Sequence, residues 1–109
     1  MAIPHASSGQ VINVQPLGAR LSSERTIALF KSAQLEVIRL VLQSGKSFPP
    51  HWVAGEITLQ CIEGQLEVMV EGERHVLSAG EMLFLVQRVV HGVTALQDSS
   101  ALVTIVLTK

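Results

Sequence analysis

The sequence carries little charge: charged residues make up 16% of its 109 residues, and the formal net charge is −1. Its few basic residues are scattered, whereas a nucleic-acid-binding surface needs Lys and Arg gathered on one face. Cys61 is the only cysteine, so no disulfide can form within the chain. No apolar run approaches the roughly 18 residues of a membrane helix, and the first residues lack the pattern of a signal peptide. We therefore expect a cytoplasmic protein that binds neither nucleic acid nor membranes.

Apolar side chains, by contrast, are abundant. Hydrophobic residues are 48% of the chain, which is high for a length that allows only one domain. A composition of this kind leaves apolar surface for a partner to cover. A second copy of the same chain is the simplest such partner, so we expect a homodimer.

Short alternating segments separated by turns run through most of the sequence. In residues 65–70, for example, Leu66, Val68 and Val70 alternate with Gln65, Glu67 and Met69. A two-residue hairpin signal, Glu71 and Gly72, follows. The pattern predicts further strands over residues 11–14, 25–31, 34–43, 57–61, 73–77, 82–86, 91–96 and 101–107.

Turns recur at intervals of roughly eight to twelve residues, which is typical of a β-sandwich or jelly-roll barrel. No segment indicates a long helix. We therefore predict an all-β fold in which residues 11–109 form a single barrel domain. Residues 1–10 are expected to be a weakly ordered lead-in.

Two stretches, residues 45–64 and 80–91, each bring a histidine after a glycine turn. Gly45 stands six positions before His51, and Gly80 stands eleven before His91. This spacing resembles the cupin family. Its first motif runs Gly, five residues, His-x-His, three or four residues, Glu, six residues, Gly; its second runs Gly, five residues, Pro-x-Gly, two residues, His, three residues, Asn. The resemblance covers roughly residues 35–107 and implies a double-stranded β-helix, the jelly-roll barrel of cupins.

The sequence departs from both motifs. Val53 stands at the second histidine position of the first motif, and Ile57 stands at the glutamate position. In the second motif, the proline, glycine and asparagine positions hold Val86, Arg88 and Ala95. A cupin metal is typically held by three histidines and the glutamate. The resemblance therefore implies at most a weak two-histidine site, His51 and His91, for a divalent ion such as Zn, Ni, Mn or Fe.

Three further residues have two interpretations each. Glu56 lies one position before the expected carboxylate, so its side chain faces away from the histidines unless a β-bulge near Gly55 reverses it. Cys61 lies on the inward face by alternation and is either a thiolate ligand or a small buried hydrophobe. Arg88 either receives an anionic ligand or is a solvated loop charge.

The expected pocket is mostly apolar, with two imidazoles as its polar groups, which suits a small apolar ligand oriented by one or two hydrogen bonds. Its predicted residues are His51, Val53, Ile57, Leu59, Cys61, Phe84, Val86, His91, Val93 and Ala95. We therefore predict a small cupin that binds such a molecule. The alternative is a metal-dependent cupin enzyme of the dioxygenase, decarboxylase or isomerase type. Because N-terminal strands of cupins often pair with the neighbouring subunit, we expect the dimer contact within residues 11–31.

Overall fold

The computed structural model describes residues 5–107 and is built from strands, with one short 3₁₀ helix, η1 (Gly18–Ser23). The strands are β1 (Ile27–Lys31), β2 (Leu35–Leu42), β3 (Ser47–His51), β4 (Ile57–Glu63), β5 (Gln65–Val70), β6 (Glu73–Ser78), β7 (Met82–Leu85), β8 (His91–Ala95) and β9 (Ser99–Val106). The predicted all-β fold is confirmed. Within residues 5–107, no helix is long and apolar enough to cross a membrane.

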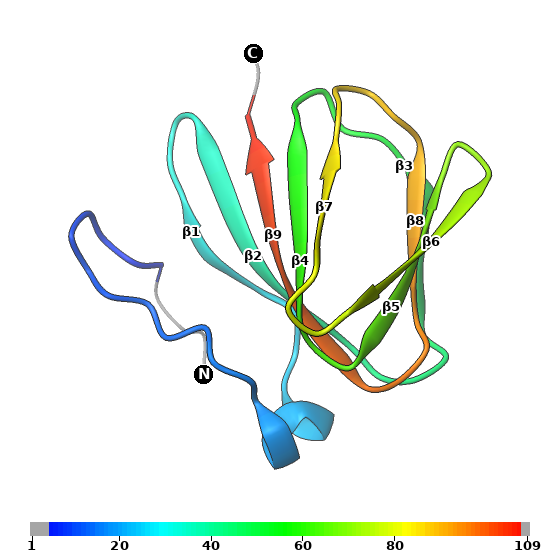
Figure 1. Cartoon of the computed structure of the whole chain (residues 1–109). Coiled ribbons are helices and arrows are strands. Elements are labelled where there is room, and N and C mark those ends of the chain that lie inside the picture. The colour runs from blue at the N-terminus through cyan, green and yellow to red at the C-terminus, as the bar shows by residue number, and fades with distance from the viewer. Residues whose placement is uncertain (1–4, 108–109) are drawn as a thin grey trace.

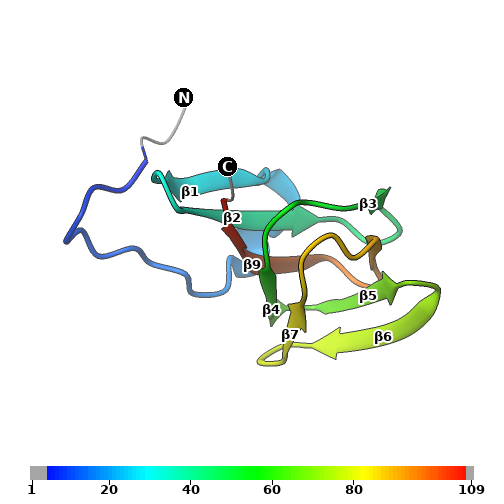
Figure 2. The same ribbon diagram turned by 90° about the horizontal axis from the view of Figure 1, so that it is seen from above.

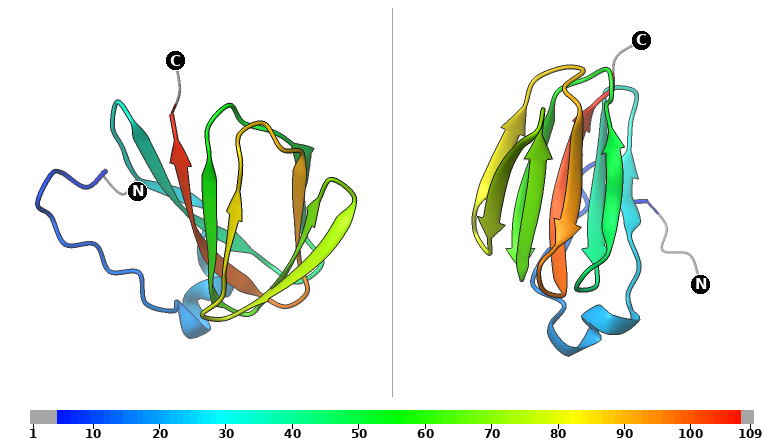
Figure 3. Two further views of the ribbon diagram at one scale, coloured as in Figure 1. Left: turned by 45° about the horizontal axis from the view of Figure 1, so that its top comes forward. Right: turned by 90° about the vertical axis from the view of Figure 1, so that its right-hand side faces the viewer.

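The strands form two antiparallel sheets that pack face to face (Figures 1 and 3). Sheet A has the order β1-β2-β9-β4-β7, and sheet B has the order β3-β8-β5-β6. Chain neighbours β4 and β5 lie in different sheets, so the chain crosses from one layer to the other at Gly64. A side chain there would collide with the backbone, because a Cβ on Gly64 would lie 2.3 Å from the carbonyl oxygen of Asp98.

The core fills the space between the sheets, and strand alternation selects its members. In β5, Leu66 and Val68 are 1% and 0% exposed, whereas their neighbours Gln65 and Glu67 are only partly buried. Sheet A contributes Leu40, Leu59 and other side chains of the same parity. The period-two pattern of the sequence thus predicted the inward face of β5 correctly.

The hairpin between β5 and β6 also follows its sequence signal. Glu71 and Gly72 both have positive φ, 50° and 83°. This is the backbone of a type I′ turn, whose twist matches that of the two strands it joins. Val70 and Glu73 close the ladder on either side of the turn.

The predicted strand over residues 11–14 is wrong. This part of the chain has no strand partner among the described residues, and Val11 is 91% exposed. Figure 2 shows the N-terminal segment running outside sheet A, on the side away from sheet B. Ile12 and Val14 are half-buried there, so their apolar character reflects packing over a sheet face and not membership of a sheet.

This covering explains why β2 is buried on both faces. Leu40 and Leu42 point into the core, while Arg39 and Val41 lie on the outer face under the N-terminal segment. Arg39 is 5% exposed. Its Nη2 donates to the carbonyl oxygen of Gln15 at 2.7 Å and to Ser100 Oγ at 3.0 Å, and it lies 3.4 Å from Glu63 Oε2.

A β-bulge brings Glu63 to this outer face. The register of β4 with β9 shifts between Cys61, which pairs with the inward Ala101, and Glu63, which pairs with Ser100. Without the bulge, Glu63 would share the inward face of Cys61. On the outer face its carboxylate accepts hydrogen bonds from Ser100 Oγ and from the backbone N–H groups of Leu17 and Gly18.

These contacts set the charge of Glu63. Burial alone would raise its pKa, but the hydrogen bonds from Ser100, Leu17 and Gly18, together with the Arg39 charge, lower the pKa below the usual value. Glu63 is therefore ionised at neutral pH and joins the N-terminal segment to the barrel. Because folding lowers the pKa of Glu63, its ionised carboxylate stabilises the folded chain at pH values above the pKa it has in the unfolded chain. This contribution is lost as the pH falls through the pKa that Glu63 has in the folded chain.

Candidate functional site

The pairing of β3 with β8 brings together two histidines that lie far apart in the sequence. His51 and His91 are direct partners in the ladder, and their ring centroids lie 4.7 Å apart at an interplanar angle of 48°. The register shifts between Phe48 and His51, where Pro49 and Pro50 stand. Proline cannot donate to a ladder and is tolerated at edge strands and bulges. β3 is an edge strand of sheet B, so the prolines cost it little pairing.

Each histidine ring is held by a backbone carbonyl two residues earlier. Nδ1 of His51 lies 3.2 Å from the oxygen of Pro49, and Nδ1 of His91 lies 3.2 Å from the oxygen of Val89. A carbonyl oxygen only accepts, so Nδ1 is the nitrogen that carries the proton in each hydrogen bond. In the neutral ring this leaves Nε2 with a free lone pair, able to accept a hydrogen bond or to bind a metal.

His91 is buried, with 5% exposure, whereas His51 is exposed. Burial lowers the pKa of His91; the hydrogen bond to Val89 opposes this effect, and the nearby His51 lowers the pKa further. His91 is therefore neutral at pH 7. The unfolded chain protonates His91 more readily than the folded chain does. The free energy of unfolding therefore decreases as the pH falls through the usual histidine pKa of about 6.5.

Both rings line a cavity of about 200 Å³ between the sheets. Its volume is below the roughly 300–1,000 Å³ of typical ligand pockets. The polar side chains of its lining are His51, His91 and Thr26. Its walls are otherwise apolar and consist of Ile38, Leu40, Phe48, Val53, Ile57, Leu59, Val93, Val103 and Ile105.

Six of the ten predicted pocket residues meet in this cavity: His51, Val53, Ile57, Leu59, His91 and Val93. Val53 and Ile57 are the two that replace ligand-type side chains of the cupin motif. They line the same cavity as the histidines and supply apolar side chains where a full cupin site would offer donors.

The other four predicted pocket residues lie outside the cavity. Phe84 and Val86 are 56% and 57% exposed. In β7 it is Leu85 that pairs with the inward Ile57, so Phe84 points to the outer face of sheet A by alternation. Cys61 and Ala95 point inward but lie deeper in the core, at 0% and 1% exposure.

Cys61 behaves as a small buried hydrophobe. Burial raises the pKa of its thiol, so the thiolate form is disfavoured at neutral pH. The thiol donates to the carbonyl oxygen of Glu63 at 3.5 Å. Its geometry and charge state both place it outside a ligand set with the histidines.

Glu56 is exposed and does not line the cavity. The register of β4 with β9 is regular from Ile57 to Cys61, and Gly55 packs directly on β9, where a Cβ would lie 1.7 Å from the carbonyl oxygen of Val106. The backbone N–H of Val106 also donates to the carbonyl oxygen of Glu56 at 2.9 Å. These contacts fix the strand entry so that Ile57, not Glu56, faces inward.

Arg88 is exposed, which agrees with a loop charge. Its φ is 61°, in the left-handed region that favours glycine, the residue of the cupin motif at this position. Its backbone N–H donates to the carbonyl oxygen of Val53 at 3.0 Å. The loop before His91 is thus joined to the loop after His51.

Sequence reasoning missed half of the cavity lining: Thr26, Ile38, Leu40, Phe48, Val103 and Ile105. Alternation contains the signal for four of these, because Ile38 and Leu40 of β2 and Val103 and Ile105 of β9 all lie on the inner face of sheet A. Thr26 comes from the segment before β1 and carries no pattern of its own.

The donor set fits a resident metal ion poorly. Within residues 5–107 no group of three or more His, Cys, Asp or Glu side chains is arranged to hold one. Two neutral imidazoles in an apolar wall leave most coordination positions to water.

Three solved structures resemble this one in fold. An RmlC-like cupin from Desulfovibrio desulfuricans is 24% identical, with a TM-score of 0.73 over 89% of this chain and 97% of that one. KdgF from Halomonas sp. is 22% identical, with a TM-score of 0.70 over 77% and 78%. Salicylate 1,2-dioxygenase from Pseudoaminobacter salicylatoxidans is 18% identical, with a TM-score of 0.67 over 73% of this chain but 25% of that one.

No curated protein matches the chain by sequence. The family model described as a cupin domain matches residues 38–107, which include β3, β8 and both histidines. This match spans well over half of the sequence and agrees with the two-sheet architecture. The chain belongs to the cupin family.

Proposed function

We propose that the cavity between the sheets binds a small, mostly apolar molecule, held at one end by His51 and His91. The observation that carries this proposal is the pair of Nδ1-anchored rings in an otherwise apolar lining. The cavity of about 200 Å³ favours a compact ligand. Desolvation of the apolar walls would supply most of the affinity, and the imidazoles would supply orientation.

The tautomer narrows the class of ligand. With the proton on Nδ1, each neutral Nε2 accepts a hydrogen bond and does not donate one. The complementary ligand therefore carries a hydroxyl or N–H donor on a hydrocarbon body, as a small alcohol or phenol does. A ligand anion would meet two acceptors and no charge of opposite sign in this lining.

Phenol and toluene are matched in size and differ in the donor, so they test this proposal. We expect phenol to bind more tightly than toluene, with NMR shifts confined to the cavity lining. Replacing His91 by alanine should weaken phenol binding by about tenfold, because one hydrogen bond in a mostly apolar site is lost. His75→Ala is the matched control, since this half-exposed histidine on β6 lies outside the cavity. Equal binding of phenol and toluene, or an unchanged affinity in His91→Ala, would contradict the proposal.

Metal binding at this site is proposed to be weak, because Val53 and Ile57 supply no donor. The variant that combines Val53→His with Ile57→Glu adds two ligand types to the lining of the cavity that already holds His51 and His91. We expect zinc, nickel and manganese to bind this variant more tightly than the natural chain in calorimetric titrations of untagged protein. Tight stoichiometric binding by the natural chain would instead favour the alternative of a metal-dependent cupin enzyme.

We also propose a homodimer that uses the outer face of β7. Met82 and Phe84 are alternate residues of this edge strand and are 60% and 56% exposed. Apolar side chains that share one face of an edge strand are the type of surface that a second copy covers. This contact lies at one edge of sheet A. The dimer contact expected from the sequence, within residues 11–31, would include β1, which lies at the opposite edge.

Sedimentation at micromolar concentration tests this contact. We expect twice the mass of one chain for the natural sequence and the mass of a single chain for Phe84→Glu. Val76→Glu serves as the control, because Val76 is an exposed apolar residue of sheet B. A single-chain mass for the natural protein would refute the dimer, and a dimer that survives Phe84→Glu would place the contact elsewhere.

A further inference from the structure

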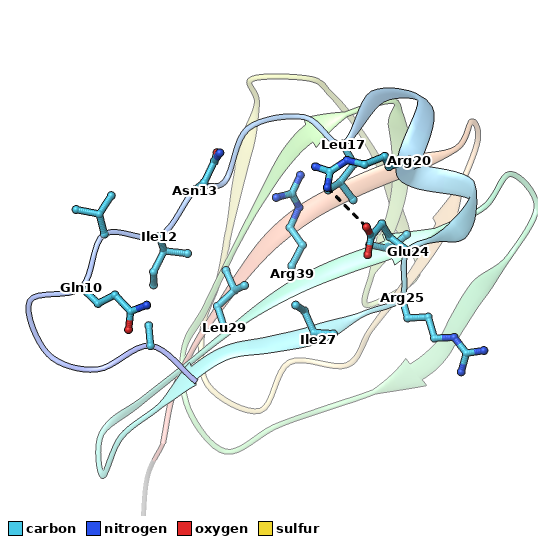
Figure 4. A pocket seen from close by; sticks show the side chains of 13 residues that line it. Gln10, Ile12, Asn13, Leu17, Arg20, Glu24, Arg25, Ile27, Leu29 and Arg39 are labelled. Carbon is cyan, nitrogen blue, oxygen red and sulfur yellow. Dashed lines mark ion pairs between the residues drawn. The ribbon is translucent and has the colours of Figure 1, made fainter. Parts of the chain in front are cut away.

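A second hollow lies on the opposite side of sheet A from the histidine cavity. It has a volume of about 300 Å³ and lies between the N-terminal segment and the outer face of β1 and β2. We call it the N-terminal hollow (Figure 4). Its apolar lining includes Ile12 and Leu17 of the segment and Ile27, Leu29 and Val41 of the sheet side.

A buried guanidinium borders this apolar space. Figure 4 shows Arg39 rising from β2 toward Asn13 and Leu17, and its side chain is 6% exposed. Its three hydrogen bonds to described residues all use Nη2. Its Nε is buried and has no partner among the described residues. The hydrogen-bonding capacity of this arginine is therefore unsaturated in a place where an unmet donor is costly.

The charge around the hollow is positive. Arg20, Arg25 and Arg39 line it, and Glu24 is the only acidic side chain in that lining. Glu24 lies 3.9 Å from Arg20 in a solvent-exposed pair, which contributes little. Glu63, whose carboxylate lies beside Arg39, already accepts hydrogen bonds from Leu17, Gly18 and Ser100. An anion that entered the hollow would meet more cationic than anionic groups.

We propose that the N-terminal hollow binds a small organic carboxylate, with Arg39 as the anchor of its charge and the apolar lining around its hydrocarbon body. A monoanion fits better than a phosphate, because Glu63 and Glu24 oppose a second negative charge and the walls offer few other polar groups. This site is independent of the histidine cavity. Sheet A separates them, since Leu40 and Arg39 point to its opposite faces.

Benzoate and benzamide provide a test, because they share size and shape and differ in charge. We expect benzoate to cause saturable NMR shifts at Ile12, Leu29 and Val41, and benzamide to bind at least about tenfold more weakly. The ring resonances of His51 and His91 should not move. Equal binding of the two compounds, shifts centred on the histidines, or no saturable binding of benzoate at millimolar concentration would overturn the proposal.

Variants at Leu29 test the site without removing the buried ion pair. Leu29 is half-buried on edge strand β1 and lines the hollow. Leu29→Glu adds a carboxylate that competes for Arg39 and should weaken benzoate binding by at least about tenfold, whereas Leu29→Gln, its neutral match, should retain it. Unchanged His51 and His91 resonances in both variants would show that the fold around the histidine cavity is intact. Equal benzoate affinities of the two variants would contradict the proposal that the Arg39 charge anchors the carboxylate.

Discussion

The register between β3 and β8 is the constraint on which the candidate site depends. It sets His51 opposite His91 on neighbouring strands, and cross-strand partners of this kind share one face of a sheet. The shift at Pro49 and Pro50 is part of this register, because one residue more or less in β3 would turn His51 away from the cavity. The carbonyl oxygens of Pro49 and Val89 then orient the two rings.

A second bulge, at the end of β4, separates two environments across sheet A. It moves Glu63 to the outer face, where the carboxylate meets Arg39 and the N-terminal segment. Among the described residues, the cavity lining on the inner side includes no Asp, Glu, Lys or Arg, and its polar groups are the imidazoles and Thr26. The outer face holds a buried ion pair that requires its hydrogen-bond partners, since removing one member of such a pair is strongly destabilising.

Local patterns in the sequence carried most of the fold. Alternation in residues 65–70 and the hairpin at Glu71 and Gly72 agree with the structure, as do the strands on either side of the two histidine motifs. Alternation failed where the chain leaves the sheets. Ile12 and Val14 are half-buried in a segment that covers a sheet face, and such a segment resembles a strand when only its composition is considered.

The site was partly predictable for the same reason. The spacing from the motif glycines predicted His51 and His91 as cavity residues, and strand alternation predicted Ile57 and Leu59. Phe84 was misplaced because the parity of β7 depends on its pairing with β4, which no local pattern reveals. The contact of Arg39 with Glu63 was not predicted, because it depends on a bulge that reverses the parity of β4 at its last residue.

The central claim is that both histidine rings donate from Nδ1 to a backbone carbonyl and therefore present Nε2 as an acceptor when the ring is neutral. Nitrogen-15 NMR of the imidazole rings across a pH series tests it most directly. We predict the Nδ1–H tautomer in the neutral form of both rings and a titration of His91 below the usual histidine pKa of about 6.5. Protonated Nε2 atoms in the neutral rings, or a His91 that titrates at or above the usual value, would contradict the account.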